Sequence, residues 1–289
     1  MGRTRKKHRG KKHRGGDPNK CIIIQLGSNR MGLGNQLFVY AAGVAAKMKW
    51  KHSLCMLNED ESSLDNSTAN PHSNTDYRPM LLQGKSINLK DPVVQSAKKI
   101  HEGFSIYNSW SNANIPDASH NYYMGRGLYH LYKPIEHVIP IIREDFKKVF
   151  SEKYPDFKID PDSAFIHVRR GDYLTYLNFH KYMPSLEYYK TGVKMLKNAG
   201  IKNIYLLSDD LKWSKNQLPG LIPFEGDEIK TLCLMSMCKG GAVISASTYS
   251  AWGVLLGPHE NPKATIIYPK QWIYHTNNPF GWPSSWKSI

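Results

Sequence analysis

The stretch Phe165-Ile166-His167-Val168-Arg169-Arg170-Gly171-Asp172-Tyr173 indicates the fold class of this chain. The short apolar run 164–168 ends in charge and then glycine, which is typical of a buried strand. In a parallel α/β sheet, the residues just past the carboxyl end of a strand face the ligand crevice. Arg169 and Arg170 would present two planar sets of N–H donors there, which match a diphosphate. Taken alone, an Arg-Arg-Gly turn is more often exposed to solvent than bound to a ligand, and a histidine such as His167 at a strand end is more often part of the core. The other motifs of the chain are therefore needed to show whether these residues form a ligand site.

Strands and helices alternate along most of the chain, which predicts an α/β fold with parallel sheets. The expected strands are 21–26, 164–168, 204–207, 241–245 and 264–268, with further candidates at 100–107 and 121–124 and a polar loop at 58–76. The expected helices are 31–49, 134–150 with a bend at Pro140, 185–199 with Ser185 as its cap, 227–238 and 248–257. A change of composition near residues 154–161 predicts two Rossmann-like domains facing across a cleft. The predicted domains are a disordered basic tail at 1–19, an N-terminal domain at 20–158 and a C-terminal, nucleotide-binding domain at 159–289.

Positive charge is concentrated at the N-terminus. The net charge is +15, and residues 1–16 carry eight Lys or Arg and no acidic residue, which leaves +7 for the rest. The segment has no apolar residue after Met1, so we expect it to be disordered. Such a tail can contact an acidic surface, nucleic acid or anionic lipid, or serve only as a solvated leader, and any attraction would weaken with salt.

The cysteines and the hydropathy pattern point to a soluble, cytoplasmic protein. None of the four cysteines forms a C-x-x-C pair, and we expect buried, reduced thiols at Cys21, Cys55, Cys233 and Cys238. No stretch reaches 18 uninterrupted apolar residues, and no signal-peptide pattern precedes the first strand.

Gly32-Leu33-Gly34 resembles the start of a dinucleotide fingerprint. Leu37 replaces the third glycine, and no acidic residue closes a strand about twenty residues further on, so a dehydrogenase is disfavoured. What remains is a backbone turn that can approach a ligand, with Asn35 at a helix N-terminus. The alternative is an ordinary turn and cap.

Two further polar groups follow expected strands of the second half. Asp209 and Asp210 come just after the strand 204–207, where carboxylates can accept hydrogen bonds from a ribose or a guanine edge, unless they only cap the next helix. Ser247 and Thr248 open the helix 248–257, whose free N–H groups can bind an anion, although ordinary capping is the alternative.

These residue types share one chemistry. Guanidinium groups, hydroxyls and helix N-termini at the carboxyl ends of strands suit a nucleotide diphosphate leaving group. When the bond from a sugar to the β-phosphate breaks, negative charge grows on the phosphate. Fixed donors stabilise that charge more in the transition state than in the ground state.

The ordered motifs resemble the α-1,2-fucosyltransferases of glycosyltransferase family 11, over about residues 20–289. The family's opening, G-L-G-N-Q-[ML]-F-x-Y-A, resembles residues 32–41, and its H-x-R-R-G-D-Y signature matches residues 167–173. The later blocks of the family fit residues 186–190, 207–210, 228–256, 268–272 and 283–287.

The resemblance implies a GT-B fold, GDP-fucose as donor, a saccharide acceptor, no required metal and an α-linked, inverted product. It implies that Arg169 contacts the β-phosphate while Arg170 and Asp172 shape the site around it. By the same resemblance His167 and Asp209 or Asp210 lie near the ribose or base, Ser247 and Thr248 face the phosphates, and Gly34 and Asn35 look across from the first domain. Asp172 and His167 are the candidates for a catalytic base.

The sequence also departs from the family pattern. Ala246 stands for the Asn of the N-S-[ST]-F block, Ala251 stands for its first Trp, and residues 124–128 do not read like the family's W-Q-S-x-x-Y-F stretch. We expect these changes to affect the choice of acceptor more than that of donor. Asp160-Pro161-Asp162 matches the D-x-D pattern of metal-dependent glycosyltransferases, but it precedes its strand, so we interpret it as a linking turn.

We therefore predict an inverting, metal-independent fucosyltransferase that acts on a saccharide hydroxyl, such as the 2-OH of galactose or a similar sugar. Three alternatives stay open. The chain could use another acceptor or another GDP-sugar, it could bind nucleotide or glycan without turnover, or it could bind nucleic acid through the basic tail.

Overall fold

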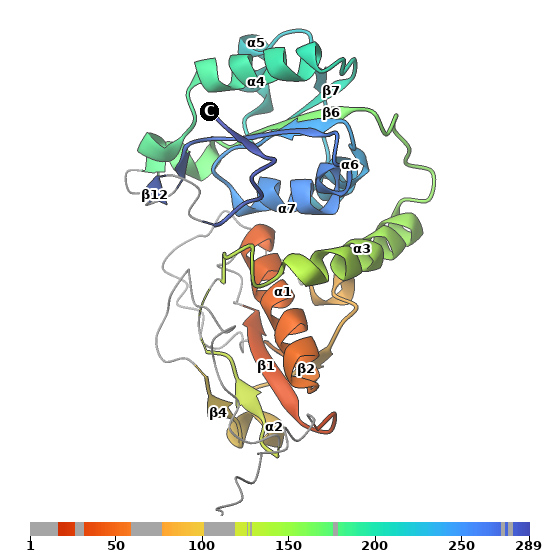
Figure 1. Cartoon of the computed structure of the whole chain (residues 1–289), viewed down its shortest axis with the longest axis vertical. Coiled ribbons are helices and arrows are strands. Elements are labelled where there is room, and N and C mark those ends of the chain that lie inside the picture. Colours follow the sequence, from red (N-terminus) through yellow and green to blue (C-terminus); the bar gives the residue numbers. More distant parts are fainter. Residues whose placement is uncertain are drawn as a thin grey trace, which may run out of the picture.

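Two parallel β-sheets, one from each half of the chain, make up the fold (Figure 1). The computed structural model describes residues 17–26, 32–58, 77–100, 119–125, 127, 129–175, 179–272, 275–276 and 280–289. Residues 1–16 of the predicted tail, most of the predicted loop at 58–76 and most of the predicted strand at 100–107 lie outside the described residues.

The first sheet has the strand order β3-β2-β1-β5-β4, and its strands are parallel. These strands are β1 (Cys21–Leu26), β2 (Ser53–Asn58), β3 (Lys85–Ile87), β4 (Lys98–Lys99) and β5 (Tyr122–Tyr123). The central strand β1 is nearly all apolar because both of its faces are covered. Helix α1 (Leu33–Trp50) packs on β1 and is apolar on almost every side over its first four turns. The short helix α2 (Pro92–Gln95) is capped by Asp91.

The second sheet has the order β13-β10-β9-β6-β7-β8, again with parallel strands. These strands are β6 (Ala164–Val168), β7 (Ile204–Ser208), β8 (Ile222–Pro223), β9 (Gly241–Val243), β10 (Thr265–Tyr268) and β13 (Lys287–Ser288). The helices are α4 (Leu186–Asn198), α5 (Leu211–Gln217), α6 (Glu228–Met237) and α7 (Thr248–Leu256), and a small antiparallel pair joins β11 (Gln271–Trp272) to β12 (His275–Thr276). All five residues of β6 are buried, as its apolar sequence predicts.

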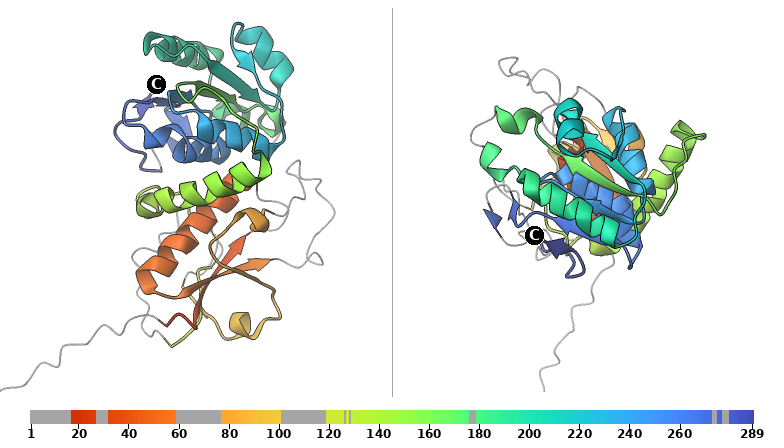
Figure 2. Two further views of the ribbon diagram at one scale, coloured as in Figure 1. Left: turned by 90° about the vertical axis from the view of Figure 1, so that its right-hand side faces the viewer. Right: turned by 90° about the horizontal axis from the view of Figure 1, so that it is seen from above.

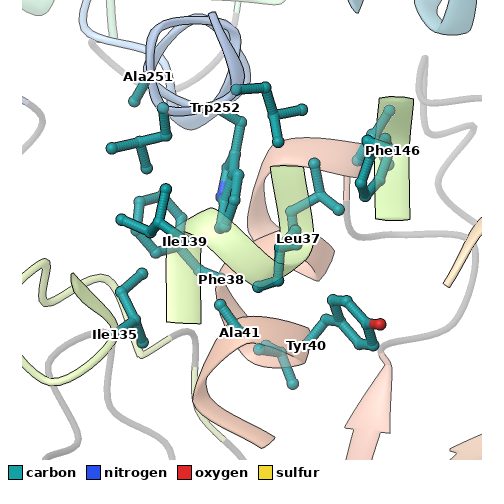
Figure 3. Packing of buried hydrophobic residues seen from close by; sticks show 14 of the residues in the cluster. Leu37, Phe38, Tyr40, Ala41, Ile135, Ile139, Phe146, Ala251 and Trp252 are labelled. Carbon is teal, nitrogen blue, oxygen red and sulfur yellow. The ribbon is translucent and has the colours of Figure 1, made fainter. Parts of the chain in front are cut away.

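The two sheets belong to two stacked domains that share one apolar joint. Helix α3 (Ile139–Lys153) crosses between them in both views of the side of the molecule (Figures 1 and 2). In the joint, Leu37 and Phe38 of α1 meet Trp252 of α7, and Ile139 and Phe146 of α3 lie beside them (Figure 3).

Two further contacts tie the domains together. Arg143 donates from Nη2 to the carbonyl of Leu255 at the end of α7, at 2.8 Å. The C-terminal segment also returns to the first domain, where Tyr132 N–H donates to the carbonyl of Phe280, at 2.8 Å. The expected fold class, an α/β GT-B type with two Rossmann-like domains facing across a cleft, is confirmed. The predicted boundary between residues 158 and 159 falls between α3 and β6, and it stays a prediction.

Two expectations were wrong. The bend at Pro140 is absent, because a 3₁₀ turn (Glu136–Val138) comes first and Pro140 then lies in the first turn of α3, where its missing N–H costs nothing. Cys21 and Cys55 are joined in a disulfide rather than reduced. They lie on the neighbouring strands β1 and β2, with 5.7 Å between their Cα atoms, and the sequence could not show that these strands pair.

Two further expectations concern the remaining cysteines and helices that could cross a membrane. Cys233 and Cys238 are buried free thiols, as expected. Within the described part of the chain, no helix combines the length and the apolar character needed to cross a membrane.

Candidate functional site

A pocket of 610 Å³ opens between the two domains at the carboxyl ends of β6 and β7. The first domain contributes the N-terminus of α1 and His130, and the second contributes the loops after β6 and β7 and the N-terminus of α7. The predicted site residues that line it are Gly34, Asn35, His167, Arg169, Asp172, Asp209, Ser247 and Thr248. The fold therefore brings together groups that lie more than two hundred residues apart in the sequence.

Arg169 is held between two carboxylates. Its Nη2 lies 2.7 Å from Asp172 Oδ1, and its Nη1 lies 2.9 Å from Asp209 Oδ2. The parallel register pairs Val168 with Ser208, so that Arg169 and Asp209 follow neighbouring strands at the same edge of the sheet. With about a fifth of the Arg169 side chain exposed, the guanidinium is oriented before any ligand arrives.

Arg170 and Asp210 are placed beside the pocket and do not line it. Arg170 donates from Nε to Asp210 Oδ2, at 3.0 Å, and its guanidinium carbon lies 3.6 Å from the centre of the Trp213 ring. Asp210 also caps α5, since its Oδ1 accepts from Trp213 N–H at 3.2 Å. The predicted ligand contacts of this pair thus find no support in the geometry. The helix-cap alternative describes Asp210, and the pair braces the loop that carries Arg169.

His167 is buried at the end of β6, with Nδ1 3.0 Å from Ser245 Oγ. Burial lowers the pKa of His167 to about 4, while the charge of Asp209 raises it and that of Arg169 lowers it further. The ring is therefore neutral at neutral pH, and His167 lines the pocket as an uncharged hydrogen-bonding group.

The N-termini of α1 and α7 both line the pocket. Figure 1 shows the upper end of α1 beneath α7. Neither helix has a side-chain cap, because Gly32 has no side chain to offer and Ser247 makes no capping hydrogen bond. Ordinary capping by Ser247, the alternative reading of the sequence, is therefore absent. Free N–H groups and the positive ends of two helix dipoles face the same cavity, which favours an anion there.

Asn35 connects the two domains across the pocket. Its Oδ1 accepts a hydrogen bond from Thr248 Oγ1, at 2.8 Å, and another from His130 Nε2, at 3.1 Å. His130 was missed in the sequence because it lies in an irregular segment between β5 and α3 and no periodicity or motif marks it. Only the packing of the domains brings it to the site.

The predicted linking turn at Asp160-Pro161-Asp162 lies before β6, away from the pocket. Asp160 Oδ1 accepts from Asp162 N–H, at 3.0 Å, as in a turn. Among the residues that the structure describes, no group of three His, Cys, Asp or Glu could hold a metal ion. Independence of metal stays a prediction.

The two buried histidines of the pocket predict a loss of stability in mild acid. Burial lowers the pKa of His130 to about 3, and the pKa of His167 is also lowered. The unfolded chain takes up protons at these positions near pH 6.5 while the folded chain does not. We expect the free energy of unfolding to be highest above about pH 6.5 and to fall by about 1 kcal/mol per pH unit for each histidine as the pH drops toward 4.5.

Urea unfolding at pH 7.5, 6 and 5 measures this dependence. The variant His130→Phe keeps an aromatic ring and loses one of the two titrating groups, so its slope against pH should be shallower by about 1 kcal/mol per unit. A variant slope equal to that of the wild type would show that His130 does not resist protonation.

This chain is similar to one protein family and to a known glycosyltransferase. The sequence profile of glycosyl transferase family 11 matches residues 107–274, more than half of the chain. The O-antigen biosynthesis glycosyltransferase WbnK of Escherichia coli is 24% identical over 312 residues, covering 89% of this chain and 98% of that protein.

Two solved structures are also similar. Fucosyltransferase NodZ from Bradyrhizobium is 14% identical with a TM-score of 0.47, covering 83% of this chain and 94% of that one. The E. coli heptosyltransferase WaaC with ADP is 10% identical with a TM-score of 0.47, covering 93% and 92%.

Proposed function

This chain belongs to glycosyl transferase family 11 and is a glycosyltransferase, and we propose that it moves L-fucose from GDP-fucose to a saccharide hydroxyl. The acceptor we propose is the 2-OH of galactose or a similar sugar, in an inverting reaction that needs no metal and gives an α-1,2 linkage. The observation that carries the proposal is the position of Arg169. It lies at the carboxyl edge of β6 in the interdomain pocket, which the N-termini of α1 and α7 also line.

The reaction places negative charge where these groups can stabilise it. As the fucosyl C–O bond breaks, charge grows on the β-phosphate of the leaving GDP. Arg169 and the N–H groups at the start of α7 would donate to that charge, and because they are fixed beforehand they favour the transition state. His167 and Asp209 would lie at the ribose or base, and Ser247 and Thr248 at the phosphates.

Arg169 exchanges partners when a diphosphate binds. The carboxylates of Asp172 and Asp209 compete with a phosphate for the guanidinium of Arg169. We infer that a phosphate replaces Asp172 as a partner of Arg169, while Asp209 stays tied to the loop through the N–H of Arg170, at 2.8 Å. The Asp172 carboxylate, no longer paired with Arg169, would then take the proton of the acceptor hydroxyl as general base.

The proposal is tested by GDP release from GDP-fucose in excess EDTA with a panel of galactose-ended acceptors. GDP-mannose with the same acceptors is the matched donor control. Acceptor-dependent release from GDP-fucose that survives EDTA would support the proposal. Release that needs added metal would overturn metal independence, and failure of both turnover and GDP binding would overturn the donor assignment.

We propose that the basic tail at residues 1–16 takes no part in binding the donor. Deleting residues 1–16 removes eight positive charges, and we expect the affinity for GDP, measured by calorimetry at 150 mM salt, to change by less than about twofold. The alternative of a nucleic-acid-binding protein predicts instead that the chain binds duplex DNA and that this binding falls steeply with salt and with the deletion. Loss of GDP binding on deletion would support the alternative in which the tail carries the main function.

The cytoplasmic location expected from the sequence remains a prediction. The disulfide between Cys21 and Cys55 is a feature of secreted and extracellular proteins more often than of cytosolic ones, and it weighs against that location.

A further inference from the structure

His130 is a buried histidine that reaches the pocket from the first domain. Only 6% of the residue is exposed, and its ring lies 5.1 Å from that of Phe38 and 5.4 Å from that of Phe280. Its Nε2 lies 3.1 Å from Asn35 Oδ1, at the edge of the cavity. A phenyl side chain would pack equally well against Phe38 and Phe280. The role of His130 must therefore come from its Nε2 atom.

The hydrogen bond fixes the orientation of the Asn35 side chain. An amide oxygen has two lone pairs, and here one accepts from His130 Nε2–H and the other from Thr248 Oγ1–H. Because Asn35 Oδ1 accepts a hydrogen bond from each domain, the NH₂ group is the end of the amide that can still bind a ligand. Thr248 gives its only hydroxyl proton to Asn35, so in this arrangement Thr248 can donate to a phosphate only through its backbone N–H.

We propose that His130 is a positioning residue for the transfer reaction, which acts by holding Asn35 so that its NH₂ group donates to an oxygen of the donor diphosphate. This inference rests on the proposed function, because it takes a nucleoside diphosphate as the ligand of the pocket. Asn35 is then a first-domain donor that complements Arg169 in the second domain. Without His130 the amide can rotate by half a turn and present its oxygen, which repels a phosphate.

A double-mutant cycle separates positioning from packing. His130→Phe keeps a ring between Phe38 and Phe280 and removes the donor, and Asn35→Ala removes the amide. We expect turnover at saturating substrates to fall by about 10-fold in His130→Phe and by about 10²-fold in Asn35→Ala. The double variant should be no slower than Asn35→Ala alone, because His130 acts only through Asn35.

If the double variant loses turnover by about 10³-fold, the product of the two single losses, the two residues act independently and the proposal is overturned. His137→Phe, the same substitution at an exposed position on the 3₁₀ turn before α3, is the matched control and should turn over like the wild type. The affinity of His130→Phe for GDP should stay within about threefold, so that the loss appears in kcat.

The protonation state of His130 tests the same hydrogen bond without any turnover. Donation to Asn35 requires a proton on Nε2, and because burial lowers the pKa of His130 to about 3, the ring is expected to be neutral with its single proton on that nitrogen. Long-range ¹H–¹⁵N spectra of the full chain should show the Nε2–H tautomer unchanged between pH 5.5 and 8. A neutral ring with its proton on Nδ1 would overturn the proposal even if GDP-fucose is turned over. An Nε2–H ring in a chain that does not use GDP-fucose would instead uphold the hydrogen bond and reject the proposed function.

Discussion

Replacing Arg169 by alanine is expected to lower the rate of GDP-fucose turnover by about 10²–10³-fold. The guanidinium is oriented in the pocket by Asp172 and Asp209, at 2.7 and 2.9 Å, before a ligand binds. Its contribution should therefore be larger in the transition state, where charge grows on the leaving phosphate, than in the ground state. The measurement is kcat for GDP release at saturating GDP-fucose and acceptor.

Arg170→Ala is the matched comparison, because Arg170 is the next residue and carries the same charge. It pairs with Asp210 and stacks on Trp213 beside the pocket, so its removal should loosen the loop and cost a few-fold in turnover. Arg169→Lys keeps the charge but loses the planar pair of donors, so its loss of turnover should lie between those of Arg170→Ala and Arg169→Ala. Equal losses in Arg169→Ala and Arg170→Ala would contradict the assignment of Arg169 to the phosphate.

Thermal unfolding has to accompany these assays. Arg169→Ala removes the ion pairs of Arg169 with Asp172 and Asp209, so we expect it to lower the stability as well as the rate. Assays below the unfolding transition of the variant tell the two effects apart. Asp209 keeps its bond to the N–H of Arg170 in that variant, which favours a folded loop.

The second half of the fold could be predicted closely from the sequence. Apolar runs bounded by glycine and charge mark β6 and β7, and Ser185 caps α4 as expected, with its Oγ accepting from Tyr188 N–H at 3.1 Å. In the first half, β5 lies within the strand predicted at 121–124, but β3 and β4 have only three and two residues, which is too short for any period to show. Their positions depend on pairing with strands far away in the chain, which local sequence does not encode.

The sequence predicts which loops form the site, but it does not predict for every side chain on them whether it enters the pocket. Carboxyl ends of parallel strands meet at one edge, so Arg169, Asp209 and Thr248 were expected together, and they line one pocket. The residue pattern alone did not distinguish Arg169 from Arg170, and only the family resemblance assigned the phosphate to Arg169. In the structure Arg169 lines the pocket, while Arg170 stacks on Trp213 beside it. His130 reaches Asn35 through the packing of two domains, and no local pattern could reveal it.

Gly34→Ala is expected to lower both the turnover and the stability of the protein. A Cβ at Gly34 would lie 2.3 Å from the backbone nitrogen of Tyr249 and 2.5 Å from the carbonyl carbon of Thr248. Both atoms belong to the backbone at the start of α7, so no side chain can move aside to make room. The two helix N-termini have to separate, which breaks the contact between Asn35 and Thr248 and widens the pocket. We expect turnover to fall by at least about 10²-fold and the free energy of unfolding to fall by about 1–3 kcal/mol.

Gly43→Ala tests whether that loss comes from the site or from overpacking alone. Gly43 lies in the same helix, and a Cβ there would meet side-chain methyl groups of Ile24 and Leu54 at 2.8–2.9 Å, away from the pocket. Methyl groups can shift by rotation, so Gly43→Ala should lose stability to a similar or smaller extent and keep most of its turnover. If both variants lose turnover in proportion to stability, the meeting of α1 and α7 is only a packing contact. If Gly34→Ala alone loses turnover, the close approach of these two helices is what sets the geometry of the donor site.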